Sequence, residues 1–178
     1  SKNIHMVFVV IEVSIVAMYI TGFYLNVKSR PFALCALLML LLINKRSAIF
    51  INGVTCLYMF MSDAFLTVSA VSDITVYSSL VISYTTSLIA IYIVSKVTSR
   101  LKVFVTGFII AVPIAISYAI LDFDMFLRMP YKAVLDGLWS GMLSVVLMMA
   151  FLPFFEKVFN VLTVYRLTEI TDHKSVLI

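Results

Sequence analysis

Apolar residues form six nearly unbroken stretches along the chain, separated by short polar loops. The stretches are Ile4–Leu25, Pro31–Ile43, Ala48–Val71, Val76–Val94, Val103–Leu121 and Ala133–Leu152. A helix needs about 20 residues to cross the hydrocarbon core of a bilayer, and all but the second stretch are close to that length. The pattern therefore predicts an all-α, polytopic transmembrane helical bundle of about six spans.

The second stretch, Pro31–Ile43, is short for a span, and its length also fits a re-entrant segment. Basic residues flank it on both sides: Lys28 and Arg30 precede it, and Lys45 and Arg46 follow it. Long basic side chains can extend toward the interface and lengthen the effective reach of a short helix. We therefore expect Pro31–Ile43 to cross the membrane.

The basic residues predict the orientation of the bundle. With six spans both termini lie on one side, which then holds Lys2, Lys45, Arg46, Lys96, Arg100, Lys102, Lys157, Arg166 and Lys174. The opposite side holds Lys28, Arg30, Arg128 and Lys132. Cytoplasmic loops carry an excess of Lys and Arg, so both termini are expected to be cytoplasmic.

The composition agrees with a membrane protein and excludes a soluble domain of ordinary size. Of the 178 residues, 63% are hydrophobic and 12% are charged, whereas soluble chains are about 45–50% apolar and about 25% charged. The net charge of +4 is explained by basic loops facing an anionic leaflet. No nucleic-acid partner is expected. Cys35 and Cys56 lie inside apolar stretches and are expected to be buried thiols.

Three carboxyl groups lie inside the predicted spans and form a candidate intramembrane polar site: Glu12, Asp63 and Asp136. Ionisable groups are costly there, so each either faces a polar cavity or is satisfied by a hydrogen bond between helices. Hydroxyl residues between Ser78 and Ser87 in the fourth span are expected mainly to bond helix carbonyls and neighbouring helices.

Two further features concern helix packing. Gly137 and Gly141 give the sixth span a small-xxx-small face. Such a face permits close contact with another helix of the same chain or, alternatively, with a second copy in a homodimer. Pro113 is expected to bend the fifth span because it removes one helical hydrogen bond.

No catalytic, metal or cofactor motif is present. The two histidines, His5 and His173, lie near opposite ends of the chain. The sequence has no zinc-ligand spacing, Walker loop or Gly-rich dinucleotide fingerprint, and no Ser-His-Asp set can be placed on facing helices. We therefore expect no catalytic residues, metal or cofactor in this chain.

The character of the sequence changes at Pro153. Residues 1–152 are predicted to form the bundle, and residues 153–178 a cytoplasmic amphipathic connector. Apolar residues in the first part of this connector recur at helical spacing, and it then becomes polar at Arg166 and Glu169.

A C-terminal motif is formed by Asp136-Gly137, Leu152-Pro153, Glu156, Phe159, Thr163, Arg166-Leu167, Glu169 and Ile170-Thr171-Asp172. An earlier piece is the apolar run that Pro31 opens and that ends in Asn44-Lys45-Arg46-Ser47-Ala48. These positions resemble the pattern of the bacterial seven-transmembrane receptors with an intracellular HD hydrolase domain, a family that includes cyclic-di-AMP phosphodiesterases. The chain departs from the family pattern at Tyr165 and after Asp172.

The resemblance implies a sensing and signal-relay module in a bacterial plasma membrane. Catalysis would belong to a downstream HD domain, and Glu156, Arg166 and Glu169 would pass a shift of the last span to it. Glu156 and Arg166 are expected to pair with each other or with a basic loop residue such as Arg46 or Arg100. Because the family has seven spans, the resemblance implies that this chain starts after the first.

Two other functions stay open at this level. Six spans also suit the substrate-binding subunit of a small-molecule transporter, in which Glu12, Asp63 and the hydroxyl residues would line a midplane pocket beside broken helices. Pro113 is the only sequence sign of such a break. A membrane scaffold, with Gly137 and Gly141 as its contact seam, is the third interpretation.

Overall fold

The computed structural model describes residues 2–25, 27–66, 73–121, 123–163, 167 and 170–172. Its helices are α1 (Lys2–Tyr24), the 3-10 turn η1 (Val27–Ser29), α2 (Leu34–Leu42), α3 (Lys45–Leu66), α4 (Asp73–Val94), α5 (Arg100–Leu121), α6 (Phe123–Arg128) and α7 (Pro130–Phe159). The described part of the chain contains no strand. The protein is thus an all-α bundle, as the hydropathy predicts.

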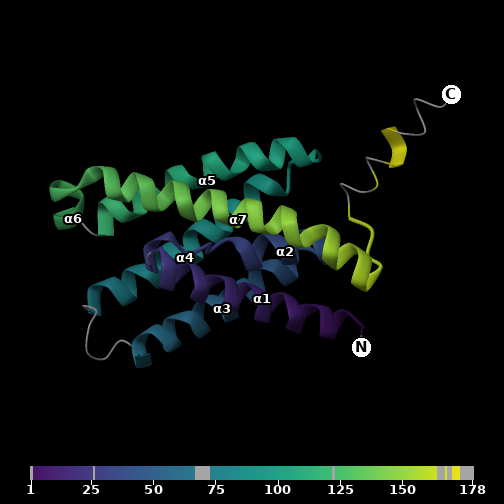
Figure 1. The fold of residues 1–178 in the computed structure, drawn as a ribbon, viewed down its shortest axis with the longest axis horizontal. Helices are drawn as coiled ribbons and strands as arrows, with labels where there is room; N and C mark the ends of the chain where they lie inside the picture. The colour runs from purple at the N-terminus through teal and green to yellow at the C-terminus, as the bar shows by residue number, and fades with distance from the viewer. Residues whose placement is uncertain are drawn as a thin grey trace.

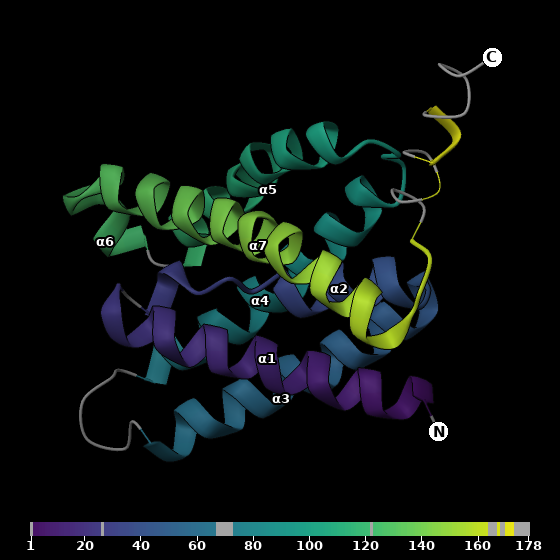
Figure 2. The same ribbon diagram turned by 45° about the vertical axis from the view of Figure 1, so that its right-hand side comes forward.

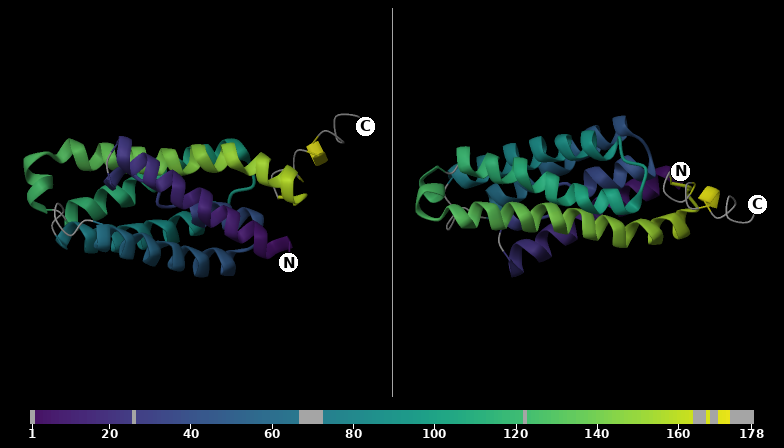
Figure 3. Two further views of the ribbon diagram at one scale, coloured as in Figure 1. Left: turned by 60° about the horizontal axis from the view of Figure 1, so that its bottom comes forward. Right: turned by 90° about the horizontal axis from the view of Figure 1, so that it is seen from above.

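Successive long helices run back and forth along one axis (Figure 1). The start of α1 and the end of α7 lie at the same end of the bundle, whereas η1 and α6 lie at the opposite end (Figures 1 and 3). We call these the Glu156 end and the η1 end. The shared end agrees with an even number of crossings, and which end faces the cytoplasm stays a prediction.

Five of the described helices are long and apolar enough to cross a membrane: Asn3–Tyr24, Lys45–Phe65, Tyr77–Val94, Arg100–Leu121 and Pro130–Phe159. These correspond to the five predicted stretches of full length. The protein is therefore a multi-pass membrane protein. Helices α3, α4 and α5 each begin three residues before the corresponding apolar stretch, at Lys45, Asp73 and Arg100.

The second predicted span has an unexpected form. Only Leu34–Leu42 is helical, and the chain between η1 and α2 runs unwound between α1 and α7 (Figure 2). From Ser29 to Met39 every residue is buried. The segment carries the chain from the η1 end to the Glu156 end through the middle of the bundle, but its start at Pro31–Ala33 is not helix.

The sixth predicted span is longer than its apolar stretch. α7 continues through Pro153 to Phe159 and ends where Asn160 adopts the left-handed conformation, with φ 50° and ψ 48°. Pro153 thus lies inside the helix, and the predicted division of the chain at residues 152 and 153 is not a break in secondary structure. Pro113 likewise lies within continuous α5.

Candidate functional site

The non-helical start of the second crossing is held in part by side chains of other helices. Residues 29–33 are all buried, and irregular backbone is tolerated at membrane depth only where its polar groups are satisfied. Ser140 Oγ of α7 donates a hydrogen bond to the Arg30 carbonyl at 2.6 Å. Ser87 Oγ of α4 donates to the Phe32 carbonyl at 3.0 Å. These two hydrogen bonds therefore connect the non-helical segment to α4 and α7.

The same segment buries a charge. Arg30 Nη1 lies 2.7 Å from Asp63 Oδ2 of α3, and the two side chains are 7% and 11% exposed. Desolvation of two ions is costly, and good hydrogen-bond geometry in a low-dielectric site offsets much of it. The pair is neutral as a unit, which lets both groups lie inside the bundle.

Gly22 of α1 leaves the space that the guanidinium of Arg30 occupies. A Cβ atom placed on Gly22 would lie 2.5 Å from Arg30 Nε, so any larger residue there would displace the cation. The Tyr19 ring lies 5.8 Å from Arg30 Cζ, and the Tyr19 hydroxyl hydrogen-bonds Ser62 of α3. A ring at this distance attracts a cation electrostatically.

Two more contacts tie η1 to the last helices. Ser29 Oγ donates to Asp136 Oδ1 of α7 at 2.8 Å, and the Tyr118 hydroxyl of α5 donates to the Lys28 carbonyl at 2.7 Å. We call the whole set the η1 junction; its residues are Lys28, Ser29, Arg30, Asp63, Tyr118, Asp136 and Ser140. Through the η1 junction a segment of three residues contacts α3, α5 and α7.

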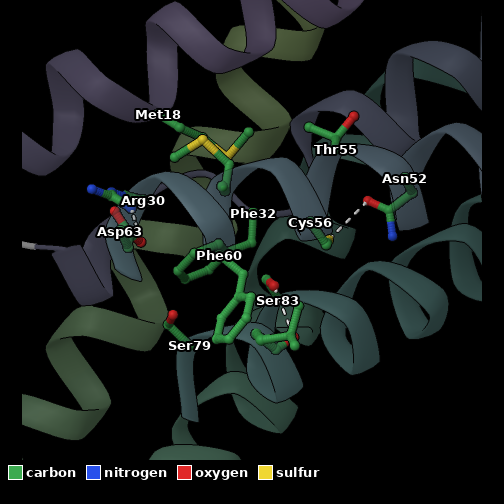
Figure 4. A pocket seen from close by; sticks show the side chains of 12 residues that line it. Met18, Arg30, Phe32, Asn52, Thr55, Cys56, Phe60, Asp63, Ser79 and Ser83 are labelled. Carbon is green, nitrogen blue, oxygen red and sulfur yellow. Dashed lines mark hydrogen bonds and ion pairs between the residues drawn. The ribbon is translucent and has the colours of Figure 1, made fainter. Parts of the chain in front are cut away.

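A small cavity adjoins the η1 junction (Figure 4). Its water-accessible volume is about 10 Å³, enough for roughly one water molecule. Its lining mixes polar and apolar side chains from α1, α3, α4 and the unwound segment: Met18, Arg30, Phe32, Asn52, Thr55, Cys56, Met59, Phe60, Asp63, Ser79, Leu80 and Ser83. Asn52 Nδ2 and Arg30 Nε are buried there without a hydrogen-bond partner among the described residues.

Helices α5 and α7 pack together along glycines. A Cβ atom on Gly141 would lie 2.6 Å from the Gly107 carbonyl oxygen, and one on Gly137 would lie 2.9 Å from the Ala111 carbonyl oxygen. The backbones are therefore in direct contact, which small residues permit. Both glycines of the small-xxx-small face are engaged within this chain. Helices α5 and α7 lie side by side in every view (Figures 1 to 3).

At the other end of α7 the carboxylate of Glu156 is buried, with the residue 3% exposed. The Thr163 hydroxyl hydrogen-bonds Glu156 Oε1, and Arg100 Nη2 of α5 lies 3.6 Å from Glu156 Oε2. We call Arg100, Glu156 and Thr163 the Glu156 cluster. The cluster folds the chain after α7 back against the bundle and joins that fold to the start of α5.

Glu12 has a different environment. It lies near the middle of α1, its side chain is exposed, and it points away from the η1 junction, because the buried positions of α1 lie on the opposite stripe. An ionised side chain at the centre of a membrane helix costs roughly 2.5–3.5 kcal/mol on insertion scales. The predicted intramembrane polar set is thus divided: Asp63 and Asp136 meet at the η1 junction, and Glu12 does not.

The remaining predicted site residues, Arg166 and Glu169, lie outside the described residues. Of the partners proposed for Glu156, the structure places Arg100 against it. Sequence reasoning missed Arg30 as a buried site residue, because a cation at the edge of an apolar stretch is ordinarily assigned to the interface. The available signal was the presence of opposite charges, Arg30 and Asp63, on neighbouring spans.

Within the described ranges, no three His, Cys, Asp or Glu residues lie close enough to hold a metal ion. The arrangement is a set of polar contacts that hold helices in register. In comparisons with known proteins, a family model described as "7TM receptor with intracellular HD hydrolase" matches residues 1–163. No curated protein and no solved structure matches the chain.

Proposed function

Because the chain belongs to the family of 7TM receptors with an intracellular HD hydrolase, we propose that its bundle relays a signal across the membrane to a linked HD domain. The moving part is the pair of helices α5 and α7. The proposal extends to a bacterial plasma membrane with the Glu156 end in the cytoplasm, and to a cyclic dinucleotide, such as cyclic di-AMP, as the substrate of the linked domain.

The observation that carries the proposal is the continuity of α7 between the η1 junction and the Glu156 cluster. Asp136 and Glu156 lie on one unbroken helix of 30 residues, separated along its axis by roughly 30 Å. That separation equals the thickness of the hydrocarbon core. A displacement of Asp136 or Ser140 can therefore be passed to the far side of the membrane along one continuous helix, in which Pro153 is the position where bending is easiest.

The packing supports motion of α5 and α7 as one unit. Gly107, Gly137 and Gly141 bring the two backbones into contact, so one helix cannot shift far without the other. Arg100 and Glu156 belong to this same pair of helices. The polar ties between the pair and η1 are directed hydrogen bonds from Ser29, Tyr118 and Ser140. Hydrogen bonds of this kind are modest in energy and can exchange between two arrangements.

The Glu156 cluster is suited to be the output of the relay. Thr163 bonds Glu156 across the turn at Asn160, so the direction in which the chain leaves the bundle depends on that contact. A shift of the α5 and α7 pair against the rest of the bundle carries Glu156, and the chain that Thr163 ties to it, to a new position. The linked domain would receive the change as a new orientation relative to the membrane. Arg166 and Glu169, farther along the connector, are proposed to pass it on.

A second function is favoured by one observation. A discontinuous helix beside a polar cavity is the arrangement in which many transporters bind solute. In the second crossing a short helix follows a non-helical segment whose Arg30 and Phe32 line a small cavity. The cavity of about 10 Å³ holds roughly one water molecule, which argues for the relay. A solute that copurifies with the bundle and is lost on Arg30→Ala would favour transport.

The test uses the protein together with its HD domain, reconstituted in lipid vesicles, with hydrolysis of cyclic di-AMP as the readout. Ser140→Ala removes the hydrogen bond to the Arg30 carbonyl at the η1 junction. Glu156→Gln removes the carboxyl group that faces Arg100 in the Glu156 cluster. Coupling free energies between sites are typically 1–3 kcal/mol, so each variant should change the rate about 5-fold or more. Thr85→Ala is the control, because this exposed hydroxyl bonds only its own helix.

The double variant Ser140→Ala with Glu156→Gln separates coupling from local damage. If the two ends act through α7, the double variant changes the rate by a factor that differs from the product of the single changes. Rates equal to wild type in both single variants, in protein of unchanged thermal stability, would overturn the relay.

A further inference from the structure

We infer that the groove between α4 and α5 binds an anionic phospholipid, with an acyl chain in the groove and the phosphate group beside Lys96 and Lys102. The inference is independent of the proposed relay and of which end of the bundle faces the cytoplasm. It rests on an apolar groove that has a lysine at the end of each wall.

The groove lies on the outer face of two consecutive spans. It has a volume of about 510 Å³ and is lined only by apolar side chains, with Ile89 and Ile93 on the α4 wall. The α5 wall extends from Val105 to Ile116, and both of these residues are more than half exposed. Because α4 and α5 are long and apolar enough to cross the membrane, a groove on their exposed faces opens towards lipid.

The length of the groove matches one leaflet of the bilayer. From Val105 to Ile116 the α5 wall measures about 17 Å along the helix axis, which is close to half of the hydrocarbon core of about 30 Å. This half adjoins the Glu156 end, because Arg100 at the start of α5 contacts Glu156. An acyl chain occupies one leaflet, whereas a spanning helix packed on this face would follow it across both. The groove therefore suits a lipid tail.

The groove ends in positive charge. Lys96 follows Ile93 by three residues, and its backbone N–H donates to the Ile93 carbonyl at 3.2 Å, so it continues the α4 wall by one turn. Lys102 precedes Val105 by three residues and continues the α5 wall in the same way. Residues 74–121, which contain both walls, include no Asp or Glu. The hairpin therefore offers these two lysines no carboxylate partner.

A tyrosine gathers a third cation at the same place. Lys96 Nζ donates to the Tyr92 hydroxyl at 2.6 Å and lies 4.1 Å from the centre of its ring. Lys45 Nζ of α3 lies 5.8 Å from the same ring centre. The ring attracts each cation, but the two like charges repel each other. A phosphate group placed beside them relieves that repulsion.

The combination selects the head group. Tyrosine side chains are enriched at the depth of lipid head groups, and basic pockets between spans bind anionic head groups. Phosphatidylglycerol carries one negative charge, which complements the lysines. Phosphatidylcholine carries a cation beside its phosphate and is a poorer match, although its acyl chains fit the groove equally well. Charge complementarity therefore predicts a preference for the anionic lipid.

The test is native mass spectrometry of the full chain released from nanodiscs that contain equal amounts of phosphatidylglycerol and phosphatidylcholine. Wild type should retain bound phosphatidylglycerol in preference. Each lysine contributes about fivefold to the binding of an anionic lipid surface, so Lys96→Gln and Lys102→Gln should each lower retention about fivefold. Lys157→Gln is the control of equal charge, because this exposed residue lies at the same end of the bundle on α7.

A second pair of variants tests the groove itself. Ile109→Trp places a larger side chain in the groove and should lower phosphatidylglycerol retention at least fivefold. Leu57→Trp, at a comparably exposed position of α3, should retain the lipid as wild type does. Both positions face away from the core, so thermal unfolding should be unchanged in both variants.

Three results would overturn the inference. The first is equal retention of the two lipids by wild type, and the second is an equal loss in Lys157→Gln and Lys102→Gln. The third is unchanged retention in Ile109→Trp; loss of a protein partner in that variant would assign the groove to the partner instead.

Discussion

Arg30 and Asp63 form an ion pair inside a membrane bundle, with Nη1 and Oδ2 2.7 Å apart and both side chains nearly inaccessible. Arg30 belongs to a segment without helical hydrogen bonds, and Asp63 to the long helix α3. The pair therefore anchors the irregular part of the second crossing to a regular element. An intact buried pair contributes little net stability, whereas removing one of its charges leaves the other buried and unpaired. The bundle therefore depends on both charges being present together.

Removing one member of the pair should be costly. In Asp63→Ala the Arg30 cation is left buried and uncompensated, and loss of one partner of a buried pair typically costs about 3–5 kcal/mol. Unfolding in mixed detergent micelles, followed by circular dichroism, measures the change. The double variant Arg30→Met with Asp63→Leu should recover most of the loss, because it removes both charges. A double variant as unstable as Asp63→Ala would contradict this account.

Gly22 should be intolerant of a methyl group. In Gly22→Ala the new Cβ would lie 2.5 Å from Arg30 Nε, and accommodating it should cost about 1–3 kcal/mol of the free energy of unfolding. Gly53→Ala is a matched control on α3, since the nearest atom to its Cβ is Tyr84 Cε2 at 3.7 Å. That variant should be neutral or slightly stabilising. Equal effects of the two substitutions would count against the placement of Arg30.

The contact between α5 and α7 should tolerate an added methyl group less well on α7, at Gly141, than on α5, at Gly107. In Gly141→Ala the Cβ meets backbone, the Gly107 oxygen at 2.6 Å and Ala111 N at 3.0 Å. In Gly107→Ala it meets side-chain atoms of Met142 and Val145 at 3.3 Å. Because side chains adjust and backbones do not, Gly141→Ala should be destabilising by about 1–3 kcal/mol.

Gly107→Ala should cost clearly less than Gly141→Ala in the same unfolding assay. Reversal of that order would show that the two backbones are not in the contact described.

Thr163 should hold the chain that follows α7. Thr163→Val keeps the shape of the side chain but removes the hydroxyl that bonds the buried Glu156 carboxylate. Loss of a hydrogen bond to a charged group costs about 1.5–3 kcal/mol. We expect faster amide exchange at Val161 and Leu162, measured by hydrogen–deuterium exchange, with α5 unchanged. Thr171→Val, which affects only a bond to the Leu167 carbonyl, is the control. Unaltered exchange in Thr163→Val would show that the contact does not restrain the turn.

The five long helices were predictable because each must present about 20 apolar residues to lipid. The form of the second crossing was not. A buried turn and a buried helix are both continuously apolar, so hydropathy cannot tell the turn at Pro31–Ala33 from the turn of helix that would replace it. Proline at position 31 is compatible with either, since it is also tolerated at the first turn of a helix.

The candidate site was predictable only in part. Asp63, Asp136 and Glu156 stand out because carboxyl groups are rare in such a sequence. Their partners do not stand out, because Ser29, Ser140 and Arg100 are of residue types that occur throughout the sequence. They become partners only because the fold brings together segments that are distant in sequence. Pro153 shows the same limit, because the apolar pattern weakens there although the helix continues to Phe159.

The unwound second crossing also has a consequence for biogenesis. Its nine-residue helix, Leu34–Leu42, is only about 14 Å long, and the serines that satisfy its unwound backbone belong to α4 and α7, which a ribosome completes later. We predict that a nascent chain truncated after residue 66 does not insert the segment Pro31–Leu42 into the membrane. Glycosylation mapping of nascent chains of increasing length should find this segment inserted only after α7 has emerged. The translocon must then hold an unfinished hairpin until the last helix arrives to complete it.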